Sequence, residues 1–215
     1  MTAVEQSYAR GKRMMEIDFS KTTDGHYVGL HGWDGSIERY FPEREGKGKE
    51  PISHDQFMTM EEKHGWHQLD LHSLVLWMEK HPDVYIITDI KKDNIGFLRY
   101  IAEHYAGMRG RFIPQIYRRD EYDQARALGF QNIIYTLYQS EDDVDEVIDF
   151  VNKHPLYGVT ISDQKFKTGR WKELLNTKKP VFVHTVNDEK RAKELLNQGV
   201  SACLLYTSPS PRDRT

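Results

Sequence analysis

The chain has 215 residues, of which 38% are hydrophobic and 29% charged, and its formal net charge is −3 at pH 7. That length and composition suit one globular domain with one core. Charges of both signs are interspersed, so no basic stripe predicts nucleic-acid binding. No apolar run approaches the roughly 18 residues that a membrane-spanning helix needs. The single cysteine, Cys203, excludes an internal disulfide framework.

The first predicted elements are the end of an amphipathic helix at residues 2–10 and a hairpin at residues 14–34. Side chains alternate along a strand, so Glu16 and Asp18 point the same way. Two neighbouring carboxylates repel each other, and a divalent cation held by oxygen ligands relieves that repulsion. The returning strand brings His31 near them, where it could move protons. A solvated hairpin with scattered charges is the alternative.

After a charged segment at residues 41–53, which we expect to be an exposed loop, strands and helices alternate. The later strands are predicted at residues 84–90, 111–117, 132–137, 157–161, 181–184 and from Val200. The helices are predicted at residues 69–80, 95–105, 121–128, 144–152, 171–176 and 188–197. Repeated strand–helix units imply a parallel sheet with right-handed crossovers. We therefore predict an α/β fold, a TIM (β/α)8-type barrel with its first strand missing.

In such a barrel the chemistry lies at the C-terminal ends of the strands. Asp89 and Lys91 lie at one such end, so Asp89 is a candidate third metal ligand and Lys91 a positive charge for an anionic substrate. Other strand ends carry four residues that could line a pocket or simply pack the barrel: Gln115, Tyr117, Tyr135 and His184.

Taken in order, several motifs resemble those of the glycerophosphodiester phosphodiesterases, a family of phospholipase-C-like phosphodiesterase barrels. They are Glu16-Ile17-Asp18, Thr22-Thr23-Asp24-Gly25, Leu30-His31, Thr88-Asp89-Ile90-Lys91 and Thr185-Val186-Asn187-Asp188. The resemblance, over residues 4–202, implies a TIM barrel that hydrolyses small-molecule glycerophosphodiesters to an alcohol and glycerol 3-phosphate. It implies a divalent metal ion, Ca²⁺ or Mg²⁺, held by Glu16, Asp18 and Asp89. It also implies acid–base catalysis shared by two histidines, of which His31 is one; we expect Lys91 to assist.

The chain departs from the family's pattern at several positions. The family's first strand carries a histidine in a His-Arg or His-Ala-Gly motif; it is absent here, so we expect this chain to be impaired. Gly32 follows His31 where the family has aspartate, Asp89 replaces a glutamate, and His184 replaces a tryptophan. The histidine of Ser53-His54-Asp55 is expected to lie in a loop and not to be a catalyst.

The barrel domain is expected to span residues 1–202. Residues 203–213 can be back-translated into a DNA string that looks like a transposase-type sequencing adapter read in frame. We therefore expect residues 203–215 to be an artefactual tail whose first residues complete the last strand; a Ser/Pro-rich disordered tail is the alternative. No signal-peptide pattern follows Met1. The location is left open, with the cytoplasm as the default expectation, because a native N-terminus upstream could carry a signal or membrane segment. The oligomeric state is not predicted.

Two other function classes fit parts of the pattern. In a barrel lyase or isomerase, Lys91 could form a Schiff base, but the Glu16–Asp18 pair would then lack a role. A non-catalytic relative could bind phosphodiesters or a protein partner, which the His31-Gly32 pair and His184 favour. Borohydride trapping would identify the first class, and metal binding without turnover the second.

Overall fold

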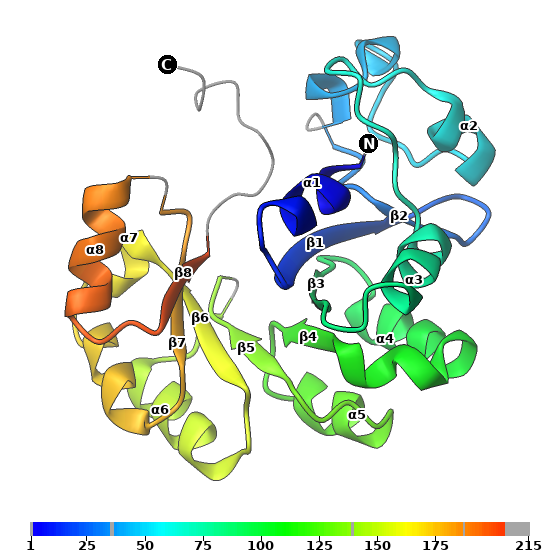
Figure 1. The fold of residues 1–215 in the computed structure, drawn as a ribbon. Coiled ribbons are helices and arrows are strands. Elements are labelled where there is room, and N and C mark those ends of the chain that lie inside the picture. Colours follow the sequence, from blue (N-terminus) through cyan, green and yellow to red (C-terminus); the bar gives the residue numbers. More distant parts are fainter. Residues whose placement is uncertain (1, 35–36, 139, 187, 205–215) are drawn as a thin grey trace. The chain divides into compact units, whose positions relative to one another are not determined.

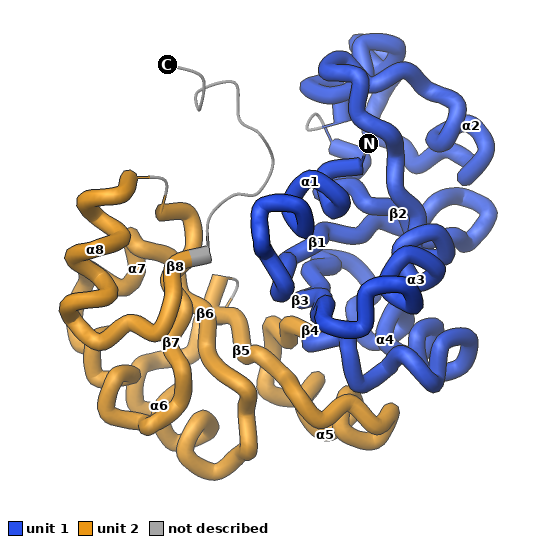
Figure 2. The backbone as a smooth tube through the Cα atoms, viewed as in Figure 1, with its two compact units in different colours: residues 1–113 blue, residues 114–215 orange. Residues whose placement is uncertain are grey.

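The structure is a computed structural model that describes residues 2–34, 37–138, 140–186 and 188–204. It divides into two compact units, residues 1–113 and residues 114–215 (Figure 2). Asn187 and all but the first two residues of the predicted artefactual tail lie outside the described residues. Each unit is described separately below.

The first unit is built on three strands: β1 (Met14–Lys21), β2 (Tyr27–Gly29) and β3 (Tyr85–Asp89), in the order β2-β1-β3 (Figure 1). β1 and β2 form the predicted antiparallel hairpin. Its turn contains Gly25 at φ 88°, a left-handed conformation that glycine adopts without strain. β3 pairs with β1 in parallel, as the strand–helix pattern predicts.

The α-helices of the first unit are α1 (Ala3–Ala9), α2 (His54–Thr59), α3 (Leu71–Glu79) and α4 (Asn94–His104), with 3-10 helices at Ile37–Arg39, Pro42–Arg44 and Ala106–Arg111. Helix α1 begins with a capping box between Thr2 and Glu5. The predicted apolar face of α3 is buried, through Leu71, Leu74, Val75 and Met78. The predicted helices of this unit are therefore confirmed to within two residues at each end.

The expected exposed loop, residues 41–53, is confirmed in part: residues 45–50 are exposed, but Phe41 and Arg44 are buried. Phe41 is buried, and it shares a hydrophobic cluster with the equally buried Phe57. The other buried members of this cluster are Val28, Leu30, Trp33, Ile37 and Met60. The apolar residues of this cluster follow neither a helical nor a strand period, so the sequence pattern did not predict that they are buried. His54 also proves not to lie in a loop: it is the first residue of α2, which Ser53 caps with Gln56.

The second unit contains β5 (Ile134–Thr136), β6 (Gly158–Ser162), β7 (Val181–His184), β8 (Ala202–Leu204) and most of β4 (Phe112–Ile116), which begins at the end of the first unit. These strands are parallel neighbours in chain order (Figure 1). Gly158 allows β6 and β7 to approach closely, since a Cβ there would lie 2.4 Å from the Phe182 side chain. The predicted strands of this unit are thus confirmed.

The α-helices of the second unit are α5 (Glu121–Ala127), α6 (Val144–Lys153), α7 (Asp163–Phe166) and α8 (Glu189–Asn197). The predicted short helix near Trp171 is a 3-10 helix, Trp171–Thr177. Its buried residues, Trp171, Leu174 and Thr177, recur every three positions, which matches the three residues per turn of that helix. None of the helices within the described ranges is both long and apolar enough to cross a membrane.

Candidate active site

Three carboxylates predicted to bind a metal share one face of the first unit's sheet. Asp18 on β1 is the parallel register partner of Asp89, the last residue of β3. Glu16 precedes Asp18 by two residues, so its side chain leaves β1 on the same face. All three residues are half-buried. The parallel register therefore brings Asp18 and Asp89 side by side from positions 71 residues apart in the chain.

The electrostatic environment of Asp18 shows that the two carboxylates interact. Burial and, to a smaller extent, the negative charge of Asp89 raise the pKa of the Asp18 carboxyl, whereas His31 and Lys91 lower it; together these effects place that pKa at about 6, above its ordinary value of 3.8. Both effects disfavour a second negative charge in this place. The pair therefore needs a compensating positive charge when both carboxyls are ionised.

His31 and Lys91 contribute the positive character beside this pair. His31 follows β2, and the preceding Leu30 is fixed by its backbone N–H, which donates to the Asp18 carbonyl at 3.0 Å. The Ser20 hydroxyl donates to the Leu30 carbonyl at 2.9 Å. Lys91, two residues beyond β3, contacts His31 through its Nζ and the imidazole Nε2. The fold thus brings these two predicted catalytic residues together.

Two of the other predicted pocket residues lie on or just after β4. Gln115 is 3% exposed, and its Oε1 lies 3.4 Å from the Thr160 hydroxyl, which is itself 2.5 Å from the Thr136 hydroxyl. Tyr117 is buried, and its backbone N–H donates to the Glu121 carboxylate at 2.7 Å. The sequence pattern did not single out Thr136 and Thr160 as the polar neighbours of Gln115. The signal that could have found them is a single threonine within each of two apolar strands.

The remaining two predicted pocket residues lie on β5 and β7. Tyr135 is buried, its hydroxyl donates to Asp142 at 2.6 Å, and its ring packs against Phe150 of α6. His184 is half-buried, with Nδ1 3.2 Å from the Thr185 hydroxyl. Thr185 has φ 64°, a left-handed conformation that is strained for a β-branched residue. Tyr135 thus faces a helix, whereas His184 ends its strand next to strained backbone.

Comparison with known proteins gives a clear result for the fold. No family model matches the chain, and neither does any curated protein. Solved structures do match. A candidate glycerophosphodiester phosphodiesterase from Galdieria sulphuraria is 18% identical, with a TM-score of 0.75 over 97% of this chain and 87% of that one. The chain has the fold of the glycerophosphodiester phosphodiesterases.

Two further glycerophosphodiester-type structures support this assignment. A glycerophosphodiester phosphodiesterase from Parabacteroides distasonis has 17% identity and a TM-score of 0.69, over 94% of this chain and 83% of that one. A phosphodiesterase from Oleispira antarctica, in complex with the product sn-glycerol-3-phosphate, has 14% identity and a TM-score of 0.68, over 94% and 84%. The predicted α/β barrel class and the resemblance to this fold are confirmed.

The residues at this site fit only in part the divalent cation that is expected for a glycerophosphodiester phosphodiesterase fold. Within the part of the chain that the structure describes, no group of three or more His, Cys, Asp or Glu is arranged to hold a metal ion. The predicted three-carboxylate set is therefore not assembled as a cluster. The Asp18–Asp89 pair nevertheless fits a hard cation, because it offers oxygen donors whose joint ionisation burial and mutual repulsion oppose. Glu16 remains a predicted third ligand.

Proposed function

We propose that this chain carries the catalytic residues of a metal-dependent phosphodiester hydrolase that acts on glycerophosphodiesters and releases an alcohol and glycerol 3-phosphate. One observation carries the proposal: a half-buried carboxylate pair, Asp18 and Asp89, lies beside the contacting His31 and Lys91. The shared fold and the glycerol 3-phosphate bound to the Oleispira antarctica phosphodiesterase support the choice of substrate.

The proposed roles follow from the chemistry of each side chain. Asp18 and Asp89, with Glu16 as the predicted third ligand, would hold Ca²⁺ or Mg²⁺. When bound, the cation supplies positive charge to the nonbridging oxygens of the phosphodiester. Lys91 adds a second positive charge for those oxygens.

In the proposed reaction, His31 transfers a proton between the attacking water and the departing alcohol oxygen. An ammonium group donates and cannot accept, so the contact of Lys91 Nζ with His31 Nε2 leaves the proton of the neutral ring on Nδ1. In that state Nε2 is the only ring atom that can accept a proton, so uptake of a proton from the attacking water requires Lys91 to move off Nε2. The imidazolium formed in this way can then protonate the departing alcohol oxygen, which returns the ring to its neutral form. Lys91 is thus a countercharge, and no observation favours its use as a Schiff-base nucleophile.

The test is hydrolysis of glycerophosphocholine, followed by the release of glycerol 3-phosphate, with Ca²⁺, Mg²⁺ or EDTA. Because the first catalytic histidine of the family is absent, we expect turnover to be slow and to occur only with a cation. We expect a further loss of at least about 100-fold in Asp18→Asn, Asp89→Asn or Glu16→Ala. Asp83→Asn is the matched control, because Asp83 is an exposed carboxylate near the other end of β3. Full cation-dependent activity in Glu16→Ala would refute the ligand assignment, and turnover in EDTA would refute the metal-dependent reaction.

A further inference from the structure

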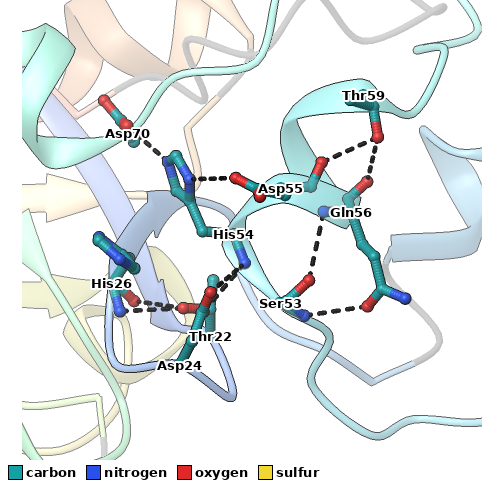
Figure 3. A network of polar contacts seen from close by, with 9 residues as sticks. All are labelled: Thr22, Asp24, His26, Ser53, His54, Asp55, Gln56, Thr59 and Asp70. Carbon is teal, nitrogen blue, oxygen red and sulfur yellow. Dashed lines mark hydrogen bonds and ion pairs between the residues drawn. The ribbon is translucent and has the colours of Figure 1, made fainter.

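A second group of titratable side chains lies in the first unit, and the proposed reaction does not use it (Figure 3). His54 Nε2 lies 2.6 Å from an oxygen of Asp70, and His54 Nδ1 lies 3.6 Å from an oxygen of Asp55. The His54 and Asp70 side chains are only 22% and 12% exposed. Asp70 also caps α3, where its other oxygen accepts from the Ser73 N–H at 2.7 Å. His54 therefore joins the start of α2 to the start of α3.

The same histidine is attached to the turn of the β1–β2 hairpin. Its backbone N–H donates to Asp24 at 2.9 Å, and the ring of His26 lies 4.7 Å from its own ring. Thr23 reinforces this contact, because its N–H donates to the Ile52 carbonyl at 3.0 Å. The hairpin turn, α2 and Asp70 at the start of α3 thus meet at His54, the turn through its backbone N–H and Asp70 through its imidazole, as Figure 3 shows.

We call residues 31–69 the insert. Both of its ends are held at the hairpin: Leu30, just before it, donates to the Asp18 carbonyl, and Leu69 accepts from the Gly29 N–H at 2.7 Å. Its interior is the hydrophobic cluster around Phe57. Its first residue is His31, the proposed proton-transfer residue. Contacts that fasten the insert therefore also bear on where His31 lies.

The charges around His54 make these contacts depend on pH. The groups that face it are the carboxylates of Asp70 and Asp55, the carboxylate of Asp24 on its backbone N–H, and the imidazole of His26. Imidazole side chains change charge near neutral pH. A protonated ring has two N–H groups and a positive charge for Asp70 and Asp55 together. A neutral ring has one N–H, so one of those carboxylates then faces a nitrogen lone pair.

We propose that His54 and Asp70 form a pH-sensitive clasp that fastens the insert to the start of α3, where Asp70 forms a β-bridge with Val28 of β2. The clasp is closed when His54 is protonated and loosened when His54 is neutral. The clasp itself does not depend on the reaction; only its effect on catalysis through His31 rests on the proposed function.

The experiment is hydrogen exchange of the full chain at pH 6 and pH 8, corrected for the intrinsic pH dependence of amide exchange. In the wild type, we expect amides of residues 54–59 and 71–74 to be protected about tenfold less at pH 8. Amides of α6 report whether the protein as a whole has changed, and we expect their corrected protection to be equal at the two pH values. Equal corrected protection of residues 54–59 at both pH values would overturn the proposal.

Variants test whether the pH dependence of amide protection comes from the clasp. His54→Gln and Asp70→Asn should show the low protection at both pH values. His154→Gln is the matched control, because His154 belongs to the second unit and its Nδ1 lies 2.8 Å from the Phe150 carbonyl oxygen. It should keep the wild-type pH dependence. If His54→Gln does not fold, Asp70→Asn carries the test, because asparagine can still cap α3. Retention of the full dependence in a folded His54→Gln or Asp70→Asn would contradict the clasp.

The exchange readout needs no substrate and no cation. A protein that neither binds a divalent cation nor hydrolyses the substrate, but has a pH-dependent insert, would therefore refute the proposed function and leave the clasp standing. An active hydrolase whose insert exchanges equally at both pH values would do the reverse.

Discussion

Asp18 illustrates how a single residue placed for chemistry affects stability. Its pKa in the folded protein, about 6, lies above its ordinary value of 3.8. The folded state therefore binds this proton more tightly than the unfolded state does. As far as Asp18 is concerned, stability is highest below about pH 4 and falls as the pH rises through about 6. Above that range the ionised carboxylate opposes folding unless a cation is bound.

This residue yields a prediction about Asp18→Asn in EDTA. Removal of the charge should make the variant more stable than the wild type by about 2–3 kcal/mol at pH 8. The difference should shrink to near zero by pH 4, where both forms are neutral. Urea unfolding followed across this pH range measures it. A variant equally destabilised at pH 4 and pH 8 would show that packing, not charge, governs this position.

Thr185 offers a second prediction at the scale of one residue. Its left-handed backbone, at φ 64°, penalises any residue with a Cβ, and a β-branched one most. Thr185→Gly and Thr185→Ala both remove the hydroxyl that contacts His184, but only glycine relieves the backbone strain. We expect the glycine variant to be the more stable of the two by about 1 kcal/mol in urea unfolding. An alanine variant of equal or greater stability would rule out strain at this position.

At the scale of elements, the insert is the part of the first unit that departs most from a plain strand–helix repeat. It has its own buried cluster, two 3-10 helices and α2, and it returns to β2 through Leu69 and Asp70. Its stability therefore comes from side-chain packing more than from regular backbone pairing.

Phe57→Ala tests that view. Phe57 is 1% exposed and contacts both Trp33 and Phe41 through edge-on rings. We expect the substitution to lower the free energy of unfolding by about 3–4 kcal/mol, because it leaves a cavity among aromatic rings. Leu76→Ala is the control: Leu76 is 45% exposed on α3, and its truncation should cost less than about 1 kcal/mol. Similar losses in chemical denaturation would show that the cluster is not a core.

At the scale of the whole molecule, cation binding gives a prediction that requires no turnover. A ligand that binds only the folded state stabilises it, by about 2.7 kcal/mol at 100 times its Kd. We therefore expect Ca²⁺ or Mg²⁺ to raise the Tm of the full chain, and EDTA to reverse the rise. Asp18→Asn and Asp89→Asn should abolish the shift, and Asp83→Asn should keep it. A shift that survives in both site variants would place the cation elsewhere.

The order of the elements was predictable from the sequence along most of the chain. Strand–helix repeats are local signals, and the short apolar strands 84–90 and 181–184 were found to within a residue at each end. The parallel arrangement within each unit follows from that alternation. Within the predicted exposed loop, residues 41–53, the prediction missed the burial of Phe41, because the apolar residues of the hydrophobic cluster around Phe57 have no regular spacing and acquire a common core only by folding back on one another.

The sequence by itself determined which residues could do chemistry and, through strand alternation, that Glu16 and Asp18 share a face. It also predicted that Asp89 and His31 lie near this pair. Only the tertiary structure decided the individual contacts: Asp18 in register with Asp89, His31 against Lys91, and His54 against Asp70. It also turned Tyr135 toward α6. The reason is physical: periodicity records which way a side chain points along its own element, whereas contacts between residues far apart in the chain arise only when elements pack.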